Sequence, residues 1–429
     1  MAMFSTTYIL MFAATMVVLV LGVLMISFRE IKKRSYYLLL TVSFGVTRIL
    51  SIVYLYGFAG SAGTSDLTNI FGYQAEQVLG GGIPYLTFES HYSPYFPYLL
   101  SLPYALYSQP VSLLSVFVVF DLLTMIVAGL YVRETWNEEA SFKFCWIYSF
   151  IPFTWLFITY WNQDEVVAAF FIVLSLRFVT RDKEMKAAAT MAVGFLLTKF
   201  LIAVFFIPLF LMMKKPIRNG LAAIGLVLLG YLPFLIVGAN ILMPITAEVG
   251  YHAVGSNPWV LMEAFGVDFP MQLPHVVVLA SLLVLACIYM LSDKLHNLRP
   301  EATIVLFSLV YMLMGKKSFS FYVPFFLVFL IIVFMRFCAK NQNRSLLVAG
   351  FLAYLVSFSF LYQSVIVFKS MQTLTVDWII SSMVYVVALT SQVLLIWLLV
   401  RESQHNSQFH YWRLDSFIKN LRSAETHEP

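Results

Sequence analysis

The chain has 429 residues, of which 61% are apolar and only 11% are charged. Soluble proteins contain about 25% charged and roughly 45–50% apolar residues, so a soluble core of this length could not bury all of these apolar side chains. The composition excludes a cytosolic enzyme, a disordered scaffold and a secreted disulfide domain, and a net charge of +5 without a free basic face argues against nucleic acid as a partner. We therefore predict an all-α, polytopic membrane protein.

Apolar runs that are long enough to cross a bilayer follow one another along the chain. Because a spanning helix needs about 20 mainly apolar residues, we predict a transmembrane helical bundle of about 13 membrane helices, within a range of about 11 to 14. The predicted segments are 6–28, 35–58, 111–131, 144–160, 165–180, 187–213, 217–239, 275–291, 300–314, 319–337, 344–368 and 377–400. Segment 187–213 is too long for one simple span, and we interpret it as two short helices that meet near the outer face, with Lys199 near the turn.

The positions of the few charges predict the orientation of the chain. Four cations lie in the short stretch 29–34, directly after the first predicted segment, and short loops rich in Lys and Arg stay in the cytoplasm. This rule places the N-terminus outside and the tail from residue 401 inside. With this orientation 22 of the 27 Lys and Arg residues lie in or beside cytoplasmic segments, while Lys316, Lys317 and Lys369 lie outside.

The predicted outer loop 59–95 contains no Lys or Arg, but it holds Asp66, Glu89 and His91. A carboxylate at Asp66 would lie at the membrane surface, where both a lipid-borne group and a polar acceptor could reach it. The alternative is that Asp66 caps the helix that begins there. Glu89 and His91 would share one face if the segment is extended, and Tyr92 begins an aromatic stretch that either guides a lipid chain or belongs to an interfacial aromatic belt.

Gln163, Asp164 and Glu165 form a polar cluster in a short connection between two predicted spans. Adjacent carboxylates at a membrane boundary are costly unless they are solvated or partnered. They either belong to a binding site or cap the next helix, where the macrodipole favours anions by ~0.3–1 kcal/mol. Lys199, which lies within an apolar run, either extends its ammonium group to the interface or serves an anionic partner.

Lys316 and Lys317 are adjacent cations on the predicted outer side, where the positive-inside rule disfavours them. A phosphate group on the outer leaflet would favour them there, because ammonium groups attract phosphate as point charges. The alternative is an ordinary hydrated loop. Arg48 and Asp121 are single charges inside predicted spans, and we interpret them as packing or ion-pair residues that can pair with each other.

The order of these elements resembles the GT-C superfamily of membrane glycosyltransferases, which take sugars from polyprenyl-phosphate-linked donors. The family's usual pattern has an acidic residue in the first outer loop, then a Gly-x-Pro-Tyr turn and an extended Phe-rich segment that ends in prolines. Asp66, Gly82-Ile83-Pro84-Tyr85 and the segment 88–95 are similar in order, with Ser93 in place of the usual first proline. The element Trp161-Asn162-Gln163-Asp164-Glu165 is similar to the family's Trp-Gly-Gln-x-Asp element.

Elements later in the chain continue the resemblance. Lys199 and Pro208 are similar to the lysine at the turn and the proline near the exit of a helical hairpin in the family. His252 lies in an outer loop similar to one in the mannosyltransferase-like branches, but the arginine that often follows that histidine is missing here. The segment 316–324, which includes Tyr322, resembles the family's late basic–aromatic–proline segment.

The resemblance implies a GT-C-like bundle whose long outer loops carry short interfacial helices. Residues 1–400 would form a single transmembrane domain, with a catalytic-module-like core at 35–215 and C-terminal helices at 216–400, followed by a cytoplasmic tail at 401–429. The implied active site lies on the external face of the cell membrane, with Asp66 as the general base. The residues implied to bind the donor or the acceptor are Glu89, His91, Tyr92, Gln163, Asp164, Glu165, Lys199, His252, Lys316, Lys317 and Tyr322.

The implied activity is inverting transfer of a hexose, with mannose as the first choice, from a polyprenyl-phosphate donor. The acceptor would be a lipid-linked glycan, a glycolipid, an envelope polysaccharide or a protein. Because Thr68 takes the second acidic position of an Asp-x-Asp metal motif, we predict no required divalent metal and no other cofactor. Two alternatives remain, a transporter or flippase of a lipid-linked sugar or other solute, and a non-catalytic assembly subunit.

Overall fold

The computed structural model describes residues 33–60, 63–64, 66–249, 252–292, 295, 298–340, 344–370 and 376–402, together with positions 9, 12–13 and 16–17. Apart from those five positions, the predicted span 6–28 lies outside the described residues. Tyr251 and the predicted cytoplasmic tail from residue 403 also lie outside them.

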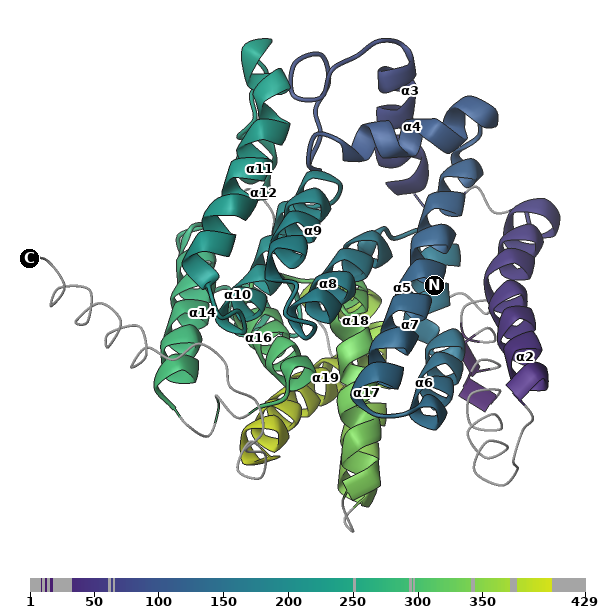
Figure 1. The fold of residues 1–429 in the computed structure, drawn as a ribbon, viewed down its shortest axis with the longest axis vertical. Helices are drawn as coiled ribbons and strands as arrows, with labels where there is room; N and C mark the ends of the chain where they lie inside the picture. Colours follow the sequence, from purple (N-terminus) through teal and green to yellow (C-terminus); the bar gives the residue numbers. More distant parts are fainter. Residues whose placement is uncertain are drawn as a thin grey trace, which may run out of the picture.

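Helices make up nearly all of the regular structure of the described residues, and most of them run along the long axis of the molecule (Figure 1). The helices of the bundle are α2 (Lys33–Gly45), α5 (Leu114–Thr135), α6 (Glu138–Phe150), α7 (Pro152–Thr159), α8 (Glu165–Val179), α9 (Glu184–Leu196), α10 (Ala203–Leu211), α11 (Pro216–Ile236), α14 (Leu273–Leu291), α16 (Pro300–Met314), α17 (Pro324–Lys340), α18 (Arg344–Ser370) and α19 (Val376–Glu402).

The remaining elements lie in the connections between these helices. They are the π-helical segments η1 (Val46–Leu50), η2 (Val53–Phe58) and η3 (Asp66–Gly72), the 3₁₀ turns η4 (Pro110–Leu113), η5 (Phe200–Ile202) and η6 (Ser320–Tyr322), the helices α3 (Tyr73–Leu79), α4 (Phe96–Leu106), α12 (Met243–Val249) and α13 (Pro258–Ala264), and the strands β1 (Val254–Gly255) and β2 (Lys317–Ser318). In Figure 1, α3 and α4 lie together at one end of the molecule, and α4 runs across the direction of α5.

The structure confirms an all-α protein with apolar helices of membrane-spanning length. Six helical stretches are long and apolar enough to cross a membrane, and further apolar helices, such as α16 and α17, are shorter. Each predicted segment between residues 35 and 400 corresponds to a helix or to a pair of helices in the described part of the chain. The number of spans and their orientation stay predictions.

Two predicted segments differ from the observed helices, and proline accounts for both differences. The segment predicted at 144–160 is two helices, α6 and α7, because Ile151 adopts an extended conformation with ψ of 128° directly before Pro152. A residue before proline is biased away from helical geometry, and proline favours the first position of a new helix. The segment predicted to begin at 319 instead contains the turn η6, and its helix α17 begins at Pro324.

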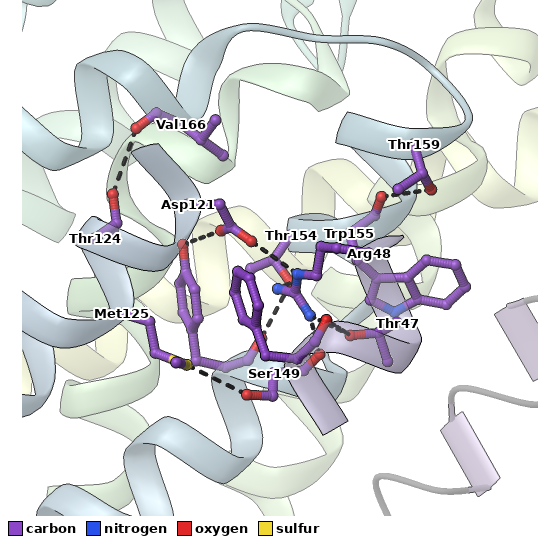
Figure 2. Close-up of polar contacts among 12 residues, drawn as sticks. Thr47, Arg48, Asp121, Thr124, Met125, Ser149, Thr154, Trp155, Thr159 and Val166 are labelled. Atoms are coloured by element: carbon purple, nitrogen blue, oxygen red, sulfur yellow. Dashed lines mark hydrogen bonds and ion pairs between the residues drawn. The ribbon is translucent and has the colours of Figure 1, made fainter. Parts of the chain in front are cut away.

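A buried ion pair joins the first helices of the bundle, as the sequence predicted. Arg48 in η1 and Asp121 in α5 are both fully buried, and Arg48 Nε lies 2.8 Å from Asp121 Oδ2. Figure 2 shows the guanidinium group pointing toward Asp121 and Thr154, and Arg48 Nη2 donates to Thr154 Oγ1 at 2.7 Å. Tyr148 donates to the other Asp121 oxygen at 2.7 Å. These bonds connect η1 to α5, α6 and α7.

Candidate functional site

A cavity of about 750 Å³ brings together connections that are far apart in the sequence. Its walls come from η3, from the connections before α4, α8, η5 and α17, and from the first turns of α14. Eight of the predicted site residues line this cavity: Asp66, His91, Tyr92, Gln163, Lys199, Lys316, Lys317 and Tyr322. The cavity therefore combines one acidic side chain, three lysines, two histidines and several aromatic rings.

Asp66 is the first residue of η3 and lies at the wall of the cavity. Its Oδ2 atom accepts a hydrogen bond of 3.0 Å from Gln163 Nε2, and the same nitrogen donates to the main-chain oxygen of Trp161 at 2.8 Å. The first turn of a helix favours a carboxylate electrostatically, so the position also agrees with the alternative of helix capping. The side-chain bond to Gln163 orients the carboxylate toward a second connection, between α7 and α8.

Asp164 and Glu165 do not line the cavity, but hold Lys199 beside it. Lys199 Nζ lies 2.7 Å from Asp164 Oδ1 and 2.7 Å from Glu165 Oε1, and both carboxylates are almost fully buried. Asp164 occupies the N-cap position of α8 but makes no capping hydrogen bond with its side chain. The two acids are therefore ion-pair partners of Lys199, while Glu165 also lies in the first turn of α8, where the macrodipole alternative places it.

Two tyrosine rings flank the Lys199 ammonium group. Lys199 Nζ lies 5.1 Å from the ring centre of Tyr92 and 5.8 Å from that of Tyr322, within the range of cation–π contacts. The hydroxyl of Tyr92 donates to Asp164 Oδ1 at 3.3 Å. Burial and the Asp164 carboxylate raise the pKa of Tyr92 well above its usual value, so this hydroxyl keeps its proton and stays a donor.

Lys199 lies at the turn of a helical hairpin formed by α9 and α10, as predicted. Two main-chain bonds attach the end of α9 to the segment before α4. Ser93 N donates to Thr198 O at 2.8 Å, and Tyr95 N donates to Leu196 O at 3.2 Å. The first predicted outer loop and the hairpin turn therefore form one unit around the cavity.

The Gly-Ile-Pro-Tyr turn links this unit to the second long outer loop. Gly82 packs so closely on Gln77 that a Cβ atom would lie 2.7 Å from its main-chain oxygen, and Tyr85 adopts a left-handed conformation with φ of 67°. Asn240 N donates to Tyr85 O at 3.0 Å, and the Tyr85 hydroxyl donates to Tyr92 O. The turn thereby holds the main chain at Tyr92, whose side chain lines the cavity.

Lys316 and Lys317 reach the cavity from a short parallel pairing of β1 and β2, in which Val254 pairs with Lys317. Val254 N donates to Lys316 O at 2.9 Å. Asn257 clamps the pairing, because its Nδ2 atom donates to Val254 O at 2.9 Å and to Ser318 Oγ at 2.8 Å. The main chain beside both lysines is thus fixed by the second outer loop.

A second charged group lies beside Lys316. Lys369 in α18 forms an ion pair with Glu263 in α13 and donates to Ala253 O at 3.1 Å. Burial lowers the pKa of Lys316; the Glu263 carboxylate opposes this effect, and the Lys369 ammonium adds to it. A bound anion would therefore relieve the unfavourable electrostatics of a protonated Lys316.

Two predicted site residues lie away from the cavity. Glu89 is exposed and does not line the cavity, whereas His91 does. The side chain of His252 is 81% exposed, and its Nδ1 atom lies 3.9 Å from Glu263 Oε2. The segment 88–95 forms no regular strand, and its bends and turns begin at His91.

Several lining residues were not among the predicted site residues. Thr64, Trp161 and Tyr311 line the cavity, as do Phe319 and Phe321, whose rings stack with centroids 4.4 Å apart. The sequence carried a signal for the last two, because they belong to the basic–aromatic–proline segment. His275 and Tyr311 gave no such signal, since they lie within apolar helices whose register around the cavity depends on packing.

Comparisons of this chain with protein-family models, with curated proteins and with solved structures found no match.

Proposed function

We propose that the protein is an inverting glycosyltransferase that moves a hexose from a polyprenyl-phosphate donor to an acceptor hydroxyl in this cavity. The observation that carries the proposal is a single cavity lined by one carboxylate, Asp66, and by the adjacent lysines Lys316 and Lys317. This reaction needs a general base beside the acceptor hydroxyl and cations beside the donor phosphate, so both kinds of group have to line the same cavity. The proposal includes about 13 membrane helices and a site on the external face.

Asp66 would act as the general base. The acceptor oxygen attacks the anomeric carbon while its proton passes to the Asp66 carboxylate, and the bond from that carbon to the lipid-phosphate oxygen breaks. The bonding electron pair leaves with the phosphate, whose charge Lys316 and Lys317 would stabilise electrostatically. Gln163 would hold the carboxylate in place through its 3.0 Å bond.

The charge distribution supports an enzyme over a transporter. The lining of the cavity comes mainly from connections that the sequence places on the outer side, and the cation in the predicted membrane hairpin, Lys199, is matched by two carboxylates. A transporter would need charged groups that can exchange partners along a path across the membrane. Lys199 is held by two ion pairs and two aromatic rings, which suits a fixed site.

A second, apolar groove offers a place for the lipid chain of the donor. It has a volume of about 610 Å³, lies between α9, α10 and α11, and none of its lining residues is charged. Phe195 lines this groove, and its ring centroid lies 5.0 Å from that of Phe200, which lines the cavity. The groove and the cavity are thus neighbours, separated by the contact between these two rings. The walls of the groove are apolar, so a hydrocarbon chain would bind there favourably.

The test is sugar transfer by protein reconstituted in lipid nanodiscs, with a radiolabelled polyprenyl-phosphate sugar and a glycolipid acceptor. Asp66→Asn keeps the size of the side chain and its bond to Gln163, but removes the base. We expect kcat to fall about 10²–10⁴-fold, the usual contribution of general-base catalysis, with the KM for the donor nearly unchanged. Asp268→Asn is the matched control, since Asp268 is exposed and lies outside the cavity.

The outcomes separate the hypotheses. If Asp66→Asn is folded and transfers sugar as fast as the wild type, the assignment of the base is wrong. If neither the wild type nor Asp268→Asn transfers sugar from any donor tested, the transporter hypothesis is favoured instead. In that case, movement of a lipid-linked sugar between the two leaflets of a vesicle is the measurement to make next.

A further inference from the structure

Asn162 lies behind Asp66 in a conformation that few side chains adopt. It is fully buried, and its φ angle of 55° places it in the left-handed region. Asparagine and glycine tolerate this region far better than other residues do. The turn between α7 and α8 therefore restricts the residue type at this position before any side-chain contact is considered.

The side chain of Asn162 connects this turn to two other segments, one at Thr64 and one at Tyr56. Its Oδ1 atom accepts a hydrogen bond of 2.8 Å from Thr64 N, two residues before Asp66. Its Nδ2 atom donates to the hydroxyl of Tyr56 in η2, and also to Ile158 O at 3.4 Å. The Tyr56 hydroxyl in turn donates to Thr159 O at 3.2 Å.

The main chain at Gly63 passes close to the Asn162 amide and leaves little room for a side chain. Gly63 has a φ angle of 82°, and a Cβ atom there would lie 3.4 Å from Asn162 Oδ1 and 2.7 Å from Leu67 Cδ2. Thr64 adds a second link, because its Oγ1 atom donates to Trp161 O at 3.4 Å. Thr64, two residues before Asp66, is therefore attached to the α7–α8 connection through both its main chain and its side chain.

From this geometry we infer that Asn162 is a positioning residue, which fixes the 63–64 segment and so sets the place of the Asp66 carboxylate at the cavity wall. Gln163 holds the carboxylate itself, and Asn162 holds the backbone that carries it. The inference rests on the proposed function, since it assigns Asn162 a role in transfer through Asp66. Asn162 does not line the cavity, so its assigned role is to position Asp66.

The test uses Asn162→Gly, which keeps the left-handed backbone and removes only the amide. Tyr56→Phe removes the hydroxyl oxygen that accepts a hydrogen bond from Asn162 Nδ2. The matched control is Asn137→Gly, because Asn137 caps α6 with a 2.7 Å bond from Ala140 N and does not line the cavity. All variants are prepared as full chains in nanodiscs of the same lipid composition.

The first measurement is hydrogen–deuterium exchange of the peptide that covers residues 63–72, which needs no activity. We expect faster exchange in Asn162→Gly and a smaller increase in Tyr56→Phe, with no change in Asn137→Gly. The second measurement is sugar transfer, in which Asn162→Gly should lower kcat about 10- to 100-fold, as for a misplaced catalytic group, without changing the KM for the donor.

Each outcome decides a different point. Unchanged exchange in Asn162→Gly overturns the inference, whatever the protein's activity is. Faster exchange with an unchanged kcat also overturns it, since the segment would then move without consequence for Asp66. If the wild type transfers no sugar, the proposed function fails, and the exchange experiment alone decides whether Asn162 holds this segment.

Discussion

Arg48 shows how a single charge is accommodated inside an apolar bundle. Its guanidinium group forms the 2.8 Å ion pair with Asp121, and Thr47, Ser149 and Thr154 accept its remaining hydrogen bonds. A buried charge of this kind is tolerated only when it is paired and its donors are satisfied. The pair thereby specifies which faces of η1 and α5 meet.

Removal of one partner should be far more harmful than removal of both. We expect Arg48→Met to lower the free energy of unfolding by about 3–5 kcal/mol, because Asp121 would stay buried without its cation. The double variant Arg48→Met with Asp121→Leu should recover most of that loss. Unfolding in detergent micelles, followed by tryptophan fluorescence, measures both. Additive losses in the double variant would show that the ion pair is not the origin of the effect.

At the scale of residues, charge placed in apolar sequence was the most informative signal. It predicted the Arg48–Asp121 pairing, and it selected Asp66 and Lys316, which the structure brings to one cavity. It did not identify Asn162, because a neutral amide in a turn looks like any other turn residue. The family resemblance selected His252, whose side chain is exposed, because the sequence alone cannot say on which side of a loop a side chain lies.

At the scale of elements, hydropathy located the helices well and their ends less well. The hairpin of α9 and α10 was predicted from one lysine in an overlong apolar run. Pro152 signals the break between α6 and α7 in the sequence, because a residue before proline disfavours helical geometry. The prediction missed this break because the segment 144–160 is apolar over the length of a single span. The pairing of β1 with β2 could not be predicted, because two residues on each side show no strand periodicity and their partner lies more than 60 residues away.

Gly255 gives a direct test of that pairing. Its φ angle is 109°, and a Cβ atom would lie 2.1 Å from Ser318 O, so alanine cannot fit without displacing β2. We expect Gly255→Ala to lower stability by at least about 1–3 kcal/mol, the cost of a strained backbone residue. Because β2 carries Lys317, the KM for the lipid-phosphate donor should rise as well, which a transfer assay would measure.

Gly266→Ala is the control for this substitution. Gly266 also has a positive φ of 69°, but a Cβ atom there would meet nothing within 4 Å. It therefore carries the backbone strain without the close approach to Ser318. Equal effects of the two substitutions on the KM for the donor would show that the pairing does not set the position of Lys317.

At the scale of the whole molecule, the cavity depends on how distant loops converge. Lining residues from 64–70, 91–92, 161–163, 199–201, 244, 275–278 and 311–322 meet around it, as far as these residues are described, although helices separate most of these groups along the chain. Hydropathy predicts which loops share a face of the membrane, but not which of them touch. That information lies in packing contacts such as Ser93 with Thr198 and Asn257 with Ser318.

The apolar groove between α9, α10 and α11 yields a prediction for the lipid chain of the donor. A Cβ atom at Gly220 would meet only Phe210, at 3.9 Å, and Gly220 lines the groove, so Gly220→Phe introduces a ring at the groove wall. We expect kcat/KM for a long-chain polyprenyl donor to fall about tenfold, equivalent to about 1.4 kcal/mol. A donor with a short isoprenoid chain should react as it does with the wild type.

Gly225→Phe serves as the matched control on the same helix. A Cβ atom at Gly225 meets nothing within 4 Å, and this residue does not line the groove. It should leave the rates with both donors unchanged. A loss that is equal for long-chain and short-chain donors in Gly220→Phe would show that the groove does not hold the chain.

The Arg48–Asp121 pair also has a consequence for the synthesis of the protein. Arg48 leaves the ribosome 73 residues before Asp121, so the first helices reach the translocon when their counter-ion does not yet exist. An unpaired arginine at the middle of a helix opposes insertion by about 2.5–3.5 kcal/mol. We therefore expect the segment 40–58 to remain beside the translocon until α5 emerges, so that integration of these two helices is a single, coupled event.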